Sequence, residues 1–133
     1  MIEVIEKSLW QRVRDRLRLS AEAHMSEHAL QDRIRLELSR RGIVLRLNVM
    51  RVQAPDGRWL TSGLPVGTSD LLFIGGGRAA FIEVKTPRGR VSQAQADFIS
   101  AVNREGAPHV TAGVARSVED AARIAGGMLW GVR

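Results

Sequence analysis

Residues 70–85 read DLLFIGGGRAAFIEVK, and this stretch decides the fold. Two apolar runs flank three consecutive glycines at 75–77, a pattern that is typical of a β-hairpin. A two-residue turn at 76–77 is the simplest way to close this hairpin. That turn sets a register in which Asp70 lies opposite Glu83, with the two Cβ atoms about 5 Å apart.

The end of this predicted hairpin concentrates charge. Side chains alternate along a strand, so Glu83 and Lys85 share one face with Phe81. Two carboxylates as close as Asp70 and Glu83 repel each other, and each raises the pKa of the other. A divalent cation removes this conflict, because Mg²⁺ takes oxygen ligands such as one or two carboxylates. We therefore predict a metal site formed by Asp70 and Glu83, with the backbone carbonyl of Val84 as a further oxygen ligand.

Lys85 is predicted to point into the same pocket. There it would orient or help to deprotonate the attacking water and neutralise charge on a phosphate. The choice of lysine is informative, because 18 of the 20 basic residues are arginine and only Lys7 and Lys85 are lysine. Lysine is a compact charge whose pKa can shift, whereas arginine is a fixed planar fork. The alternative interpretation is a plain ion pair between Glu83 and Lys85 on a half-exposed strand face.

Patterns on either side of the hairpin predict the remaining elements. Apolar spacing and caps predict helices at 2–19, from Ser26 to the Arg41–Gly42 stop, from Ser92 to about Gly106, and from Ser117 to about Gly126. Strands are expected at 43–53 and 109–115, loops at 58–69 and 86–91, and a turn at 55–57. The apolar tail 127–133 is expected to pack on the body or on a partner. The fold class is α/β or α+β, with a mixed sheet flanked by helices.

Composition narrows the class of protein. The 133 residues suit one domain, and 44% hydrophobic with 26% charged residues is typical of a folded globular chain. No apolar run approaches the roughly 20 residues that span a bilayer. The N-terminal stretch MIEVIEKSLW does not resemble a signal peptide, and the lack of cysteine excludes disulfides and thiolate metal sites. A cytoplasmic protein is therefore expected.

The net charge of +6 favours a polyanionic partner, most simply nucleic acid. Arg88 and Arg90 follow Lys85 in a basic loop that is placed to touch backbone phosphates, with Ser92 beside it as a weaker DNA-binding candidate. Arg78 and Arg104 are expected to add to a positive rim. Sparse aromatic residues argue against a platform for stacking single strands, and Trp59 is expected to pack rather than to stack on DNA. The alternative interpretation of the charge is a general preference for arginine.

Four short motifs with polar or charged residues follow one another along the predicted helices and strands. They are Glu27 in SEHALQ, Gly67 and Asp70 in GTSD, Glu83 and Lys85 in EVKT, and Ser92 and Gln95 in SQAQ. Together they resemble the VRR-NUC branch of the PD-(D/E)xK nucleases over about residues 26–115. The GTSD motif lacks the proline of the general PD motif, which the VRR-NUC pattern does not require.

The resemblance implies a restriction-endonuclease-like fold in a single domain over 1–133, with an N-terminal helical extension at about 1–22. It implies Mg²⁺- or Mn²⁺-dependent cleavage of DNA, with Asp70, Glu83, Lys85 and Gln95 as catalytic residues. Glu27 would join the metal site, directly or through water, and Gln95 would position Lys85 or the metal-bound waters. Short stand-alone members resemble virus-type enzymes that act as homodimers on branched DNA, including four-way (Holliday) junctions.

Two other functions stay open at this point. One is a restriction-type or non-sequence-specific nuclease of the same superfamily that cuts ordinary duplex. The other is a non-catalytic DNA-binding module on the same fold. The combination of Asp70, Glu83 and Lys85 argues against the module, because binding alone needs none of these three side chains.

Overall fold

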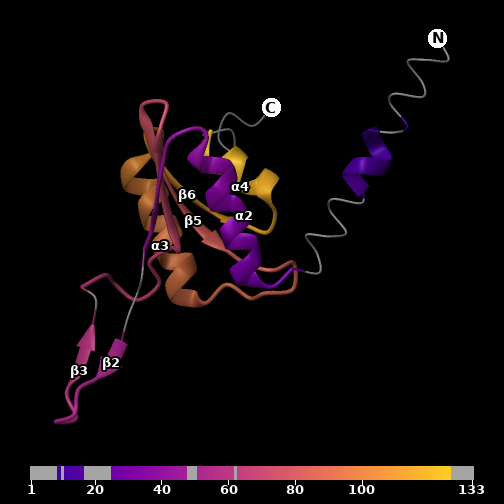
Figure 1. Ribbon diagram of the computed structural model, residues 1–133. Coiled ribbons are helices and arrows are strands. Elements are labelled where there is room, and N and C mark those ends of the chain that lie inside the picture. The colour runs from indigo at the N-terminus through magenta and orange to yellow at the C-terminus, as the bar shows by residue number, and fades with distance from the viewer. Residues whose placement is uncertain (1–8, 10, 17–24, 48–50, 62, 127–133) are drawn as a thin grey trace.

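The computed structural model describes residue 9 and residues 11–16, 25–47, 51–61 and 63–126. Its elements are, in chain order, α2 (Glu27–Ser39), β1 (Ile43–Arg46), β2 (Arg51–Gln53), β3 (Trp59–Thr61), β4 (Leu71–Gly75), β5 (Arg78–Val84), α3 (Gln93–Gly106), β6 (Val110–Ala115) and α4 (Val118–Ala125). A four-stranded mixed sheet has the order β1-β4-β5-β6, and β2 pairs with β3 separately. Figure 1 shows α2 and α4 on one face of the larger sheet and α3 on the other. The arrangement is consistent with the predicted restriction-endonuclease-like fold.

The predicted hairpin is confirmed together with its register. Gly75 of β4 pairs with Arg78 of β5, and the two turn glycines between them have φ values of 61° and 76°. Glycine adopts this left-handed backbone without a steric penalty. Continuing the ladder from this turn places Asp70, one residue before β4, beside Glu83.

The core lies between the sheet and the α2/α4 layer. Alternation sends one set of strand side chains to that face, where the apolar stripe of α2 and the small residues of α4 meet them. The buried members of this cluster are Leu30, Ile34, Leu38, Leu71, Phe73, Ala80, Ile82, Val84, Ala115, Ala121, Ile124 and Ala125. The face that carries Glu83 is therefore the opposite one, under α3.

Helix α3 connects the parallel strands β5 and β6 and fixes the second face. The ring of Phe98 packs edge-on against Phe81, with 5.3 Å between ring centroids. The side-chain amide of Asn103 bonds both backbone groups of Ala112, at 2.8 Å and 2.9 Å. Because α3 is held in this way along its length, its N-terminus is positioned beside the end of β5.

The segment between β1 and β4 differs from the prediction. The predicted strand at 43–53 is two strands, β1 and β2, separated by residues 48–50, which lie outside the described residues. The predicted loop at 58–69 is wrong at 59–61, which form β3. The predicted turn is present, since the Gly57 amide donates to the Ala54 carbonyl at 2.9 Å. This turn folds the chain back on itself, and β3 forms because it pairs with β2.

The N-terminal helix is described only in part. Residues 11–16 are helical, whereas the rest of the predicted helix at 2–19 and the tail 127–133 lie outside the described residues. The apolar residues Leu9 and Val13 of this helix are 54% and 37% exposed, so they do not pack in the core. No helix within the described residues is both long and apolar enough to cross a membrane.

Candidate active site

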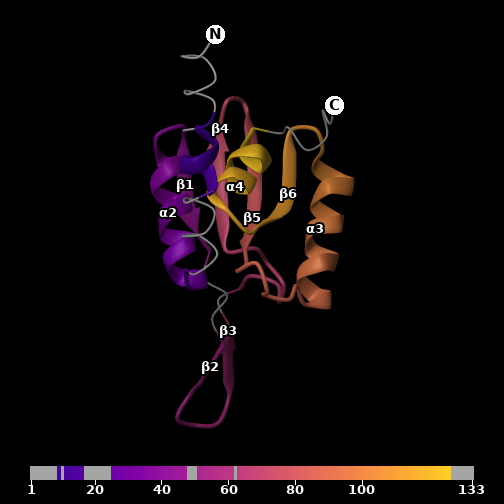
Figure 2. The same ribbon diagram turned by 90° about the vertical axis from the view of Figure 1, so that its right-hand side faces the viewer.

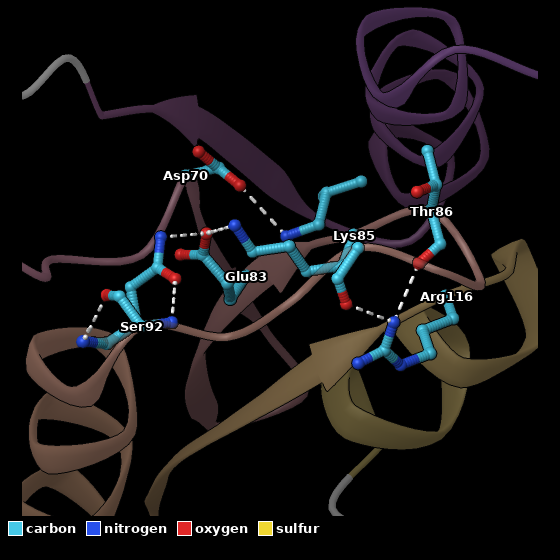
Figure 3. Close-up of polar contacts among 9 residues, drawn as sticks. Asp70, Glu83, Lys85, Thr86, Ser92 and Arg116 are labelled. Atoms are coloured by element: carbon cyan, nitrogen blue, oxygen red, sulfur yellow. Dashed lines mark hydrogen bonds and ion pairs between the residues drawn. The ribbon is translucent and has the colours of Figure 1, made fainter.

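Three predicted residues meet where β4 begins and β5 ends. Figure 3 shows Asp70, Glu83 and Lys85 side by side at this edge of the sheet. The ammonium of Lys85 lies 3.7 Å from Oε1 of Glu83, and only 14% of the Lys85 side chain is exposed. The three side chains therefore lie together as the sequence predicted, and their roles in a shared pocket stay a prediction.

The backbone of β5 contributes to the same place. The ladder between β4 and β5 ends at the pair Leu71 and Ile82, and beyond it Oδ2 of Asp70 accepts the Val84 amide at 2.9 Å. The amide and carbonyl of one strand residue point toward the same neighbouring strand. The Val84 carbonyl therefore points to the side on which Asp70 lies, as a metal ligand at this position would require.

Glu83 is the most unusual group in the site. Its side chain is only 2% exposed, yet Oε2 has no hydrogen-bond partner among the described residues. Burial above all, and then the negative charge of Asp70, raise the pKa of Glu83 to about 7, while Lys85 acts in the opposite direction. A buried carboxylate with a free oxygen beside a second carboxylate is a good binding site for a cation.

The N-terminus of α3 holds the other oxygen of Glu83. The Ser92 hydroxyl accepts the Gln95 amide at 3.2 Å, and the Gln95 side-chain oxygen accepts the Ser92 amide at 2.9 Å. This capping box leaves the side-chain NH₂ of Gln95 free to donate to Oε1 of Glu83 at 2.7 Å. Gln95 therefore contacts Glu83 directly, whereas the prediction gave its partners as Lys85 or metal-bound waters. Its part in catalysis stays a prediction.

The loop before Asp70 requires a glycine at position 67. Its φ is 94°, and a Cβ at this position would lie 2.3 Å from the Ala94 carbonyl oxygen of α3. The loop therefore passes against the first turn of α3 where no side chain fits. This close approach brings Asp70 to the same place as the Gln95 amide.

Glu27 is in the first turn of α2 and is exposed. Its negative charge contributes to the raised pKa of Glu83, so the two groups interact electrostatically. Within the described residues, however, no three acidic or histidine side chains gather as a metal-binding cluster. The role of Glu27 at the metal stays a prediction. One turn along α2, Gln31 is only 6% exposed and its side-chain oxygen has no partner in the described part of the chain.

Arg116 is a residue that the sequence analysis missed. Its Nη1 atom donates to the carbonyls of Thr86, Gly89 and Pro87, at 2.7, 2.8 and 3.3 Å. Figure 3 shows the bond to Thr86. The Gly89 amide also donates to the Thr86 carbonyl at 2.9 Å, which closes a tight turn after Lys85. Arg116 follows β6 directly, so only the parallel register of β5 and β6 reveals that it reaches this turn.

The turn held by Arg116 carries two of the predicted DNA-binding residues. Arg88 and Arg90 are both exposed beside the site, whereas the Ser92 hydroxyl is occupied as a helix cap. Arg78 and Arg104 lie elsewhere, because Arg78 begins β5 and Arg104 is in the last turn of α3. The expected positive rim therefore does not extend to these two residues.

The donors that meet at this edge fit a hard divalent cation. They are a carboxylate from Asp70, the unpartnered buried oxygen of Glu83 and the carbonyl of Val84. All three are oxygen donors, the type that Mg²⁺ and Mn²⁺ prefer. A mixed sheet with these groups at the ends of two adjacent strands, next to a lysine, defines the class of PD-(D/E)xK nucleases.

The family model of the VRR-NUC domain matches residues 5–118. This range covers most of the chain, so the chain belongs to the VRR-NUC family. Membership implies a nuclease of the PD-(D/E)xK type, a family that typically uses a divalent metal, with DNA as its partner. No curated protein and no solved structure matches the chain.

Proposed function

We propose that this protein is a Mg²⁺- or Mn²⁺-dependent endonuclease that hydrolyses phosphodiester bonds in branched DNA such as four-way junctions. The observation that carries the proposal is Glu83, a buried carboxyl group with one unpartnered oxygen between Asp70 and Lys85. An ordinary structural ion pair has no need of a second carboxylate or of an oxygen left without a donor.

The residues of the candidate site would have different roles in the reaction. Asp70, Glu83 and the Val84 carbonyl would hold the cation, which supplies a Lewis acid and a bound water of lowered pKa. Gln95 keeps Oε1 of Glu83 in place, which leaves Oε2 without a donor and able to bind the cation. Lys85 holds an ammonium beside Glu83, where it can orient the attacking water and neutralise charge on the phosphate.

DNA would approach over the turn after Lys85. Arg88 and Arg90 are exposed there and would contact backbone phosphates, which orient a duplex without reading its sequence. The preference for branched DNA and the homodimer come from the resemblance to short stand-alone members. A twofold dimer would offer two sites to the two strands of a symmetric junction. The exposed Leu9 and Val13 are apolar surface available to such an interface.

The first test is cleavage of a labelled four-way junction beside its linear duplex arms, with Mg²⁺, Mn²⁺ or EDTA. Metal-dependent cleavage that favours the junction is expected. Lys85→Ala and Lys85→Arg should both lose activity, because a guanidinium cannot replace a compact ammonium in this pocket. Equal cleavage of junction and duplex would show that the enzyme does not prefer branched DNA, and the proposed substrate would then be ordinary duplex. Tight binding without cleavage in any metal would make the protein a DNA-binding module and overturn the proposal.

A further inference from the structure

The hairpin of β2 and β3, residues 51–61, is called the arm below. Figures 1 and 2 both show it standing apart from the sheet and helices, beyond the end of the molecule at which α2 and α3 begin. The chain leaves the body after Leu47, whose amide donates to the Asp70 carbonyl at 2.8 Å, and it returns to Asp70 through 63–69. The arm therefore extends from the edge of the candidate active site.

The two faces of the arm differ in chemistry. The register pairs Arg51 with Thr61, Val52 with Leu60 and Gln53 with Trp59. Paired residues share a face, so one face is polar and aromatic (Arg51, Gln53, Trp59 and Thr61) and the other is apolar (Val52 and Leu60). On the polar face the Arg51 guanidinium lies 4.5 Å from the centre of the Trp59 ring. Trp59 is 55% exposed.

The arm is well formed at its tip but is not packed on the body. The Ala54 amide donates to the Arg58 carbonyl at 2.7 Å, and the Asp56 carboxylate accepts from both the amide and the guanidinium of Arg58. All six strand residues are nevertheless exposed. A two-stranded hairpin alone in water is marginally stable, so a partner on one of its faces would stabilise this arm.

The surroundings favour DNA as that partner. The arm starts beside Asp70, where DNA must lie if the protein is a nuclease. Its charge is +1 from two arginines and one aspartate, in a chain of net charge +6, so a polyanion is attracted whereas a second copy of the arm has the same sign of charge. Arginine recognises phosphate, and tryptophan stacks on bases.

We propose that the polar face of the arm binds the DNA that the active site cuts, with Arg51 on a backbone phosphate and Trp59 stacked on a base. Inside a duplex the base faces are covered by their neighbours, whereas at a branch point the continuous stack is interrupted and a base face is more easily uncovered. The arm therefore selects branched over linear DNA. This inference rests on the proposed nuclease function and names the residues that recognise its substrate.

The test measures binding of a labelled four-way junction and of its linear arms by fluorescence anisotropy, with Ca²⁺ in place of Mg²⁺. Trp59→Ala should bind the junction about tenfold more weakly and the duplex nearly as well as the parent. Arg51→Ala should weaken the binding of both the junction and the duplex. It should also lower the slope of binding affinity against salt concentration by about the value of one phosphate contact. Leu60→Ser, on the opposite face of the same hairpin, is the matched control and should leave both affinities unchanged.

A second variant guards against a misfolded arm. Trp59→Phe keeps an aromatic ring and should retain most of the junction preference. If Trp59→Ala binds junction and duplex as the parent does, the arm is not the recognition surface. If Leu60→Ser instead separates a dimer and loses the junction, the arm joins two copies of the chain, and the inference is wrong. Both results leave metal-dependent cleavage of DNA by the parent intact, whereas failure of the nuclease proposal would remove that cleavage.

Discussion

The chain builds two β-hairpins from similar turn chemistry and places them in opposite surroundings. β4 and β5 turn through two glycines and lie between helices on both faces, while β2 and β3 turn at Asp56-Gly57 and are exposed along their whole length. Turns that contain glycine thus favour a hairpin, and a continuous apolar run decides whether both of its faces are buried. LLFI and AAFI are such runs, whereas the arm alternates polar and apolar residues and has only Val52 and Leu60 on its apolar face.

The acids of the two hairpins show what burial does. Burial and Asp70 raise the pKa of Glu83 to about 7. Hydrogen bonds from the backbone and the side chain of Arg58 lower the pKa of Asp56, which is exposed. The first carboxylate is poorly neutralised by its surroundings and has capacity for a cation, whereas the second already has the donors it needs.

The largest expected effect is that of Glu83→Gln. An amide can still accept from Gln95, but it cannot supply the negative charge that holds a cation, so cleavage should fall by about 10³-fold. The melting temperature in EDTA at neutral pH should change little, because the lost ion pair with Lys85 is offset by relief of burial and of the repulsion from Asp70. Asp56→Asn in the arm is the matched control and should leave cleavage close to that of the parent. Full activity of Glu83→Gln would contradict the assigned site.

Stability without metal should depend on pH through the same carboxyl group. The pKa of Glu83 rises from its ordinary value of 4.5 to about 7 on folding, so between these values the folded protein binds the proton more tightly than the unfolded chain. The free energy of unfolding should therefore fall as pH rises through this window, by up to about 3 kcal/mol.

Urea denaturation in EDTA at about pH 5 and about pH 8 measures this difference, with Glu83→Gln as the reference that lacks the group. Adding Mg²⁺ at the higher pH should restore stability to the parent and leave the variant unchanged. A parent and variant with parallel pH profiles would show that Glu83 is ionised at its ordinary pKa in the folded protein.

Two glycines with similar φ values, one beside the buried hairpin and one in the arm, give a third test of the comparison. Gly67 has a φ of 94° and a Cβ there would meet the Ala94 carbonyl oxygen at 2.3 Å, whereas Gly57 in the arm has a φ of 87° and open space around it. Gly67→Ala should lower the free energy of unfolding by about 2–3 kcal/mol. Gly57→Ala should destabilise the hairpin of the arm by about 1 kcal/mol. The midpoint of urea unfolding should stay almost unchanged, because the arm is not packed on the body. Equal shifts in the two variants would show that the contact with α3 is not tight.

Local signals were sufficient for most of the fold and for the placement of Asp70 beside Glu83. The glycine turn set the register that brings Asp70 beside Glu83, and the three serine caps marked the starts of α2, α3 and α4. Each of these signals lies within a few residues of what it determines. The sequence alone was therefore enough to predict them.

What the sequence did not reveal depends on contacts between distant segments. β2 and β3 have three residues each, too short for a reliable alternation pattern, so the arm was split between a strand and a loop. Arg116 acts on a turn 27 to 30 residues before it, through a parallel register that no local pattern encodes. The unpartnered oxygen of Glu83 likewise follows from the position of Gln95 in three dimensions.

The smallest expected effect tests how the turn after β5 is held, in contrast to the tip of the arm. The arm's tip is fixed by its own residues Asp56 and Arg58, while the turn at 86–89 is fixed by Arg116, which directly follows β6. Arg116→Ala should loosen this turn and raise KM for DNA about fivefold, equivalent to roughly 1 kcal/mol.

The value of kcat should stay nearly unchanged in Arg116→Ala, because the Lys85 amide is held independently by the Ala115 carbonyl at 3.0 Å. Arg116→Lys should recover only part of the affinity, since one ammonium cannot reproduce a planar group set against three carbonyls. When Arg88 and Arg90 are already alanine, Arg116→Ala should add nothing, because the turn then has no phosphate contacts to position. An equal loss in kcat would show instead that Arg116 supports Lys85 and the chemistry itself.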